Sequence, residues 1–319
     1  EAVGNTVERL FIVPGNHDVD RNNNLRNDAI DALLGYYKPK EGFLKKEDLL
    51  NIGVGRNDFV TVMEQVYGSD SDRIKLYKDY GKPSFLIETE DFNIIHADST
   101  ILYKKGYEKY EMILGTGLLM DILEKANPKK PSVLLTHYSY DALSRNEQKQ
   151  IFQILKDYNV QLWFAGHEHD KHVHEHNRYL YEFQCGNLVH EDEYTMSCFI
   201  VGEYDTERNA GSIQVHAWFS PDGWGVYPKI SEEEDRSKYS FFLQTPDTVV
   251  EQIISSSEQP ALRQLGDGIA TFNVKELNQK QLKYLQDEGY IDVRAQLGSR
   301  LTGKESDDEA EKLFLAALH

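Results

Sequence analysis

Three short segments of the chain carry side chains that can donate nitrogen or oxygen to metal ions. They are Pro14-Gly15-Asn16-His17-Asp18, Leu134-Leu135-Thr136-His137-Tyr138 and Phe164-Ala165-Gly166-His167-Glu168-His169. Neutral imidazoles, side-chain amides and carboxylates suit Mn, Fe, Zn and Mg ions better than thiolates do. Two such ions about 3.5–4 Å apart can clamp the oxygens of a phosphate group. Any one of these histidines alone would favour an ordinary buried or loop position, whereas the three segments together favour a metal centre.

Each segment follows an apolar run that predicts a buried strand, at Leu10–Val13, Ser132–Thr136 and Val160–Ala165. A strand therefore ends next to His17, His137 and His167. The amphipathic pattern at Gln148–Tyr158 predicts a helix between the last two strands, and such alternation is typical of an α/β sheet with its site beyond the strand ends. We expect Gly15 and Gly166 to let the backbone turn sharply beside the metals.

The remaining patterns predict the rest of the organisation. Residues 29–80 are helical with interruptions, which is typical of a cap inserted into a domain. The other elements expected are a hairpin of Phe85–Glu88 and Phe92–Ala97, a helix at Gly117–Ala126, a second, antiparallel sheet of Tyr179–Gln184, Met196–Glu203 and Ser212–Phe219, and a helix at Val274–Glu288.

The order of the three segments resembles the calcineurin-like metallophosphoesterase family, whose later motifs are GNH(D/E), a lone strand-end His and GHxH. The resemblance runs from about Leu10 to Gly186. It implies an α/β fold, a four-layer α/β/β/α sandwich with a helical insertion and a C-terminal extension. We accordingly expect a metallophosphoesterase domain over residues 1–230 and an extension of mixed strand and helix over residues 231–319.

The resemblance also implies roles for individual residues. It assigns two divalent metal ions, Mn ahead of Fe, Zn or Mg, with Asn16, His137 and His167 as ligands of the second ion and His169 as a ligand of the first. His17 resembles the catalytic histidine, which stabilises the transition-state phosphate charge or protonates the leaving oxygen. Asp18 is expected to orient His17.

The chain departs from the family pattern before Asn16. The family begins with Asp-x-His and Gly-Asp motifs, which supply two ligands of the first metal and the carboxylate that bridges the ions. Residues 1–15 contain neither Asp nor His. We expect these motifs to lie upstream in a longer protein, so that this chain alone is inactive; a degenerate family member is the alternative.

The implied activity is hydrolysis of a phosphoester by a hydroxide held between the two ions. Among substrates we favour a phosphodiester, either a nucleotide or a nucleic-acid end. A phosphoprotein or small-molecule phosphatase is an alternative within the enzyme class, and a non-catalytic scaffold or sensor module of a larger protein is an alternative outside it. The formal net charge of −18 disfavours a broad nucleic-acid-binding surface.

Composition bounds the location and the partners. No apolar run approaches the roughly 20 residues of a membrane span, no signal or lipidation motif is visible, and the two cysteines form no disulfide framework. We expect a soluble, cytoplasmic protein without a membrane partner. The C-terminal extension is the expected contact for other domains or subunits.

Three groups of residues leave alternatives open. Arg21 and Asn22–Asn24 either contact substrate phosphate or form an ordinary loop. His96, Asp98 and Ser99 belong either to the site or to strand-end packing and a turn. His172, His174 and His176 alternate as they would in another metal site, but we favour a solvated loop or strand face.

Overall fold

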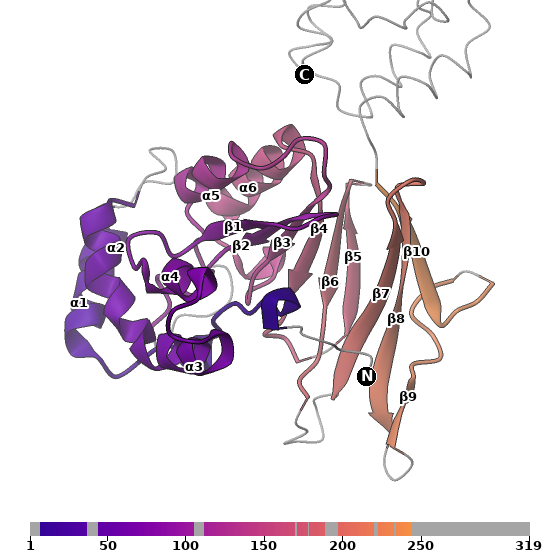
Figure 1. Ribbon diagram of the computed structural model, residues 1–319, viewed down its shortest axis with the longest axis horizontal. Helices are drawn as coiled ribbons and strands as arrows, with labels where there is room; N and C mark the ends of the chain where they lie inside the picture. Colours follow the sequence, from indigo (N-terminus) through magenta and orange to yellow (C-terminus); the bar gives the residue numbers. More distant parts are fainter. Residues whose placement is uncertain are drawn as a thin grey trace, which may run out of the picture. The chain divides into compact units, whose positions relative to one another are not determined.

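Two sheets form the centre of the structure, a computed structural model (Figure 1). It describes residues 7–36, 44–104, 112–169, 171–177, 179–188, 197–219, 223–232 and 234–243. Within the described residues, the helical elements are η1 (Val7–Arg9), η2 (Asn16–Asp18), α1 (Asn24–Tyr36), α2 (Lys46–Gly53), η3 (Val54–Arg56), α3 (Asn57–Tyr67), α4 (Asp72–Lys78), α5 (Thr116–Leu123), η4 (Tyr140–Ala142) and α6 (Arg145–Asp157). No helix in these ranges is long and apolar enough to cross a membrane.

The first sheet has the strand order β1-β2-β3-β4-β6-β5. Its four inner strands are parallel, and the two edge strands are antiparallel to their neighbours. The strands are β1 (Phe85–Glu88), β2 (Asn93–His96), β3 (Ser132–Leu135), β4 (Val160–Ala165), β6 (Leu180–Gln184) and β5 (His172–His176). The inner strands are rich in buried apolar residues, as expected for strands covered on both faces.

The second sheet is antiparallel, with the order β10-β8-β7 and with β9 paired to β8. Its strands are β7 (Cys198–Asp205), β8 (Ala210–Phe219), β9 (Gly223–Val226) and β10 (Lys238–Phe242). A shared apolar core joins the sheets, with Val133, Leu162 and Phe183 from the first packed with Ile213 and Phe241 from the second. Burial of these side chains is the main free-energy term holding the two sheets together.

Helices α5 and α6 cover the other face of the first sheet, through a core that includes Leu119, Ile151, Leu155 and Trp163. The described residues thus supply a helix layer and two sheet layers, and α1 to α4 form a separate group beside β1 (Figure 1). On the outer face of the second sheet Trp218 and Trp224 are 46% and 44% exposed. The α/β class with two sheets is confirmed, and three of the four expected layers lie in the described part of the chain.

Two predicted strands differ from the structure. Leu10–Val13 is not a strand: side chains bind its carbonyl groups, since Tyr67 and Arg73 donate to Leu10 O and Tyr77 donates to Ile12 O. These donors from α3 and α4 take the place of a ladder partner.

Tyr179–Gln184 was expected in the second sheet, but β6 lies in the first sheet and runs parallel to β4. The connection from β4 to β6 is the edge strand β5 rather than a helix. After β4 no helix separates the strands among the described residues, yet β5 and β6 still belong to the first sheet.

The first compact unit extends past residue 230 to Leu243, because β10 pairs with β8. The second unit is Gln244–His319. The helix predicted at Val274–Glu288 lies outside the described residues.

Candidate metal centre

The carboxyl ends of β3 and β4 bring two of the predicted ligands together. The strands are parallel and pair Leu135 with Phe164, and Gly166 N–H donates to the His137 carbonyl at 3.0 Å beyond the strand ends. The imidazole rings of His137 and His167 consequently lie 5.0 Å apart between centroids.

Asn16 completes a cluster of three donor atoms. His137 Nε2 lies 3.2 Å from Asn16 Oδ1 and 3.2 Å from His167 Nδ1. Neighbouring donors that share one ion at about 2.1 Å are separated by about 3.0–3.4 Å in tetrahedral or octahedral geometry. Both separations lie in this range, so Asn16, His137 and His167 are candidate ligands of one divalent cation.

The electrostatics of His137 also suit a metal ligand. Burial, together with the neighbouring imidazoles of His167, His169 and His17, lowers the pKa of His137 to about 3. His137 is thus neutral at pH 7 and keeps a lone pair for an ion. Their effect on this pKa indicates that His17 and His169 lie near His137, and both of these side chains are solvent-exposed.

The GHxH loop carries backbone strain at its histidines rather than at its glycine. His167 and His169 have φ values of 71° and 53°, in the left-handed region, where an L-residue costs about 1–2 kcal/mol. Strain of this kind clusters at functional sites. The turn expected from Gly166 is therefore made by the two candidate ligands themselves.

Gly15 is required for close approach. A Cβ atom at this position would lie 3.1 Å from His137 Cε1 and 3.2 Å from its Nδ1. The Gly15→Ala variant should displace the His137 ring and weaken divalent metal binding by about tenfold, as loss of ligand orientation does elsewhere. Isothermal titration with Mn²⁺ measures this effect. Gly166→Ala is the matched control, because its Cβ would lie at an ordinary 3.8 Å from His137 Nδ1, and an equal loss in both variants would contradict the steric argument.

The loop from Asn16 to Arg21 fixes the expected catalytic residues. Gly15 N–H donates to Asp18 Oδ2 at 2.8 Å, so the Asp18 carboxylate closes the η2 turn. His17 Nδ1 lies 3.4 Å from Arg21 Nη2. Because a guanidinium only donates, this contact makes Nδ1 the acceptor and leaves the His17 proton on Nε2. The orientation of His17 by Asp18 stays a prediction.

Two buried residues at the carboxyl ends of β2 and β3 contact His137 and His167. The sequence did not assign either of them to the site. Ser99 Oγ accepts the N–H groups of His137 and Tyr138 at 3.2 and 3.0 Å. The Tyr138 ring packs 4.4 Å from the His167 ring and is fully buried. Ser99 was left between the site and strand-end packing, and the one sequence signal for Tyr138 is its place directly after His137.

The histidine row His172, His174 and His176 lies on one face of the edge strand β5. His176 Nε2 is 2.7 Å from Glu182 Oε2, and the His172 and His174 ring centroids are 3.9 Å apart. In the part of the chain that the structure describes, no three His, Cys, Asp or Glu side chains are arranged to hold a metal ion. The three histidines accordingly lie on a partly exposed strand face, which is the alternative that the sequence favoured over a metal site.

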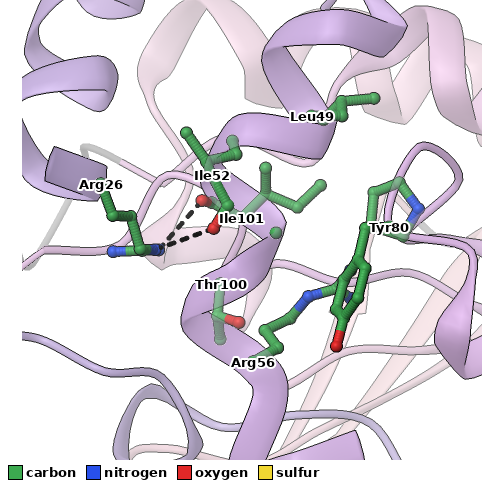
Figure 2. Close-up of a pocket in the computed structure, with 9 residues that line it drawn as sticks. Arg26, Leu49, Ile52, Arg56, Tyr80, Thr100 and Ile101 are labelled. Atoms are coloured by element: carbon green, nitrogen blue, oxygen red, sulfur yellow. Dashed lines mark hydrogen bonds between the residues drawn. The ribbon is translucent and has the colours of Figure 1, made fainter. Parts of the chain in front are cut away.

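A small cavity between α2, η3 and the loop after β2 is separate from the donor cluster. Arg26, Arg56 and Tyr80 line this cavity (Figure 2). Its volume of about 10 Å³ is enough for one water molecule. A phosphoester substrate does not fit there.

Comparison with known proteins identifies the family of the chain. A family model described as "Calcineurin-like phosphoesterase" matches residues 1–171. The chain is 24% identical over 230 residues to "Uncharacterized metallophosphoesterase-like protein YydB" of Bacillus subtilis (strain 168), covering 68% of this chain and 46% of that protein. The chain thus spans less than half the length of this curated relative. Since the family model covers more than half of the chain and includes all three donor segments, the chain belongs to the calcineurin-like phosphoesterase family, whose members generally bind two divalent metals and hydrolyse phosphoesters.

Proposed function

We propose that the protein is a metal-dependent phosphodiesterase that acts on a nucleotide or nucleic-acid-end phosphodiester. The observation that supports the proposal is that His137 Nε2 lies 3.2 Å from Asn16 Oδ1 and 3.2 Å from His167 Nδ1. These three groups are the proposed ligands of one divalent ion, and His169 is the proposed ligand of a second. When bound, the ions would polarise the phosphoryl oxygens and lower the pKa of the attacking water.

The chain's own residues supply binding and proton transfer. His17 is exposed at the rim and is the proposed general acid, whose imidazolium form would donate the Nε2 proton to the leaving alkoxide, because a neutral imidazole is too weak an acid to give it up. In that form Nδ1 is protonated as well and no longer accepts from Arg21. Asp18 holds the loop through Gly15 N–H, so that His17 keeps its place while substrate exchanges. Protonation of the leaving oxygen matters most for a poor leaving group such as a nucleoside or sugar hydroxyl, which favours an alkyl ester as substrate.

Arg21 is the proposed contact for the phosphate charge. Its guanidinium lies beside His17, and Asn27 Nδ2 donates to the Arg21 carbonyl at 3.0 Å, which fixes the backbone there. Arg21→Met should raise KM by about tenfold with little change in kcat, because a hydrogen bond from a charged group contributes about 1.5 kcal/mol or more. Steady-state kinetics measure the split. Arg208→Met, which breaks an exposed pair with Asp205 on the second sheet, is the control, and a purely kcat effect at Arg21 would contradict its role.

The decisive experiment uses the full-length protein. Metal content is measured by elemental analysis, and Mn²⁺-dependent turnover of bis(p-nitrophenyl) phosphate is compared with that of p-nitrophenyl phosphate. About two metals per chain and a higher kcat/KM for the diester are expected. A higher kcat/KM for the monoester would make the protein a phosphatase instead.

A non-catalytic scaffold or sensor is the second candidate. It is favoured by the limited donor set: within the described ranges, no three His, Cys, Asp or Glu side chains surround a common point. Elemental analysis separates the two candidates, because a full-length protein that holds no divalent metal would support the scaffold and overturn the enzyme.

A further inference from the structure

We propose that Arg56, in the helical segment between the donor loops, is a positioning residue of the metal centre and acts through Asp98 and Ser99 on the backbone of His137. The inference rests on the proposed function only for its effect on metal binding. The contact path itself is independent of whether a metal is bound.

The path begins at a buried ion pair. Arg56 ends η3 and is 6% exposed, and its Nη1 lies 2.6 Å from Asp98 Oδ2. The guanidinium carbon is 5.5 Å from the centre of the Tyr80 ring, beside which Figure 2 shows it. Within the described residues Arg56 Nη2 has no hydrogen-bond partner, and the one-water cavity borders this side chain. Both charges of the pair are therefore out of bulk solvent, where solvent screens them little.

Hydrogen bonds fix both the carboxylate and the backbone N–H of Asp98. Its Oδ1 accepts Thr100 N–H at 2.8 Å and Thr100 Oγ1–H at 2.7 Å, and its own N–H donates to Ser84 Oγ at 3.0 Å. With Oδ2 bound to Arg56, both carboxylate oxygens are used. These contacts on both sides of Ser99 restrain the loop after β2.

Ser99 carries the constraint to the proposed ligand. Its Oγ accepts two consecutive N–H groups, from His137 and Tyr138, at the point where β3 ends. A residue directly after a strand has lost its ladder partner, so this hydroxyl replaces the missing acceptor. The backbone of His137 is fixed in this way, and its imidazole is aimed at Asn16 and His167.

The same short helix also anchors the loop that bears His17. Asp20 N–H donates to the Gly55 carbonyl at 2.8 Å, next to Arg56 in the chain. Arg26 packs over Gly55 and donates to the carbonyls of Ile52, Ile101 and Tyr103. Burial lowers the pKa of Arg26 to about 10, so it stays charged at neutral pH and keeps these bonds. The helical segment therefore ties the loop that bears His17 to the loop after β2, which lies far from it in the sequence.

The test uses Arg56→Met and Ser99→Ala in the full-length protein, with amide hydrogen exchange as a readout that needs no metal. In both variants exchange at His137 and Tyr138 should rise about tenfold relative to the β4 amides, because the local hydrogen bonds are weakened or lost. The affinity for Mn²⁺, measured by titration calorimetry, should fall about 10–100-fold, as it does when an outer residue that orients a ligand is removed. Arg56→Lys, which keeps a positive charge next to Asp98, should show smaller changes in both exchange and Mn²⁺ affinity than Arg56→Met.

Two controls separate positioning from general loss of stability. Lys78→Met breaks an exposed pair with Glu64 in the same helical region and should change neither readout. Met63→Ala removes a buried side chain from the α3–α4 core and should lower stability without a selective change at His137. If Arg56→Met does not fold, Arg56→Lys tests the contact of Arg56 with Asp98, and Ser99→Ala tests the step from Ser99 to His137.

The outcomes distinguish the inference from the proposed function. Unchanged exchange at His137 and Tyr138, or unchanged Mn²⁺ affinity in variants of a protein that binds metal, would overturn the positioning role and leave the proposed function intact. A wild-type protein that binds no Mn²⁺ would overturn the proposed function and the effect on metal binding, whatever the exchange data show.

Discussion

Replacing His137 by alanine is expected to abolish binding of one divalent ion and to lower kcat/KM by about 10³-fold, since a metal ion stabilises transition-state charge by several kcal/mol. His137 is the hub of the donor cluster, because its Nε2 contacts both Asn16 and His167. Its imidazole is neutral at pH 7 and partly buried, so it supplies a lone pair that alanine cannot replace. Elemental analysis of the variant and steady-state kinetics at saturating Mn²⁺ measure the two effects.

The control for this prediction is His216→Ala. His216 stacks on Phe199 on the second sheet, away from the donor loops, and its loss should leave metal content and turnover unchanged. Thermal unfolding of both variants shows whether the fold is kept. A folded His137→Ala protein with wild-type metal content would contradict the ligand assignment.

Replacing His17 by alanine is expected to lower kcat by about 10²–10⁴-fold, the usual contribution of a positioned general acid. Metal content should not change, because the converging donor atoms belong to other residues. The loss should be greater for an alkyl phosphodiester than for a p-nitrophenyl ester, whose leaving group needs no proton. Kinetics with the two esters measure this difference.

The leaving-group comparison also decides between the two roles expected for His17. An equal loss with both esters would indicate that His17 stabilises the phosphate charge and does not donate the proton. His172→Ala is the control, since this exposed histidine lies on the edge strand β5. Loss of metal from the His17→Ala protein would contradict the assignment of His17 as a catalytic residue rather than a ligand.

Much of the fold could be predicted from local patterns. The β1–β2 hairpin, the strands at Ser132 and Val160 and the helix before Val160 all match their predicted places, because continuous apolar runs and a 3.6-residue period are local properties. Leu10–Val13 has the same apolar pattern and is not a strand. Whether an apolar run pairs depends on a neighbouring strand, and here Tyr67, Arg73 and Tyr77 bind its carbonyl groups instead.

The sequence by itself determined the donor types, their order and the family, because motifs at strand ends are encoded within a few residues each. Only the tertiary structure decided that His137 lies 3.2 Å from both Asn16 and His167, and that His167 and His169 take left-handed backbone conformations. It also decided that a helical segment reaches the site through Arg56, Asp98 and Ser99. The physical reason is that hydrogen bonds between residues far apart in the chain depend on how the elements pack, and local residue patterns do not record that packing.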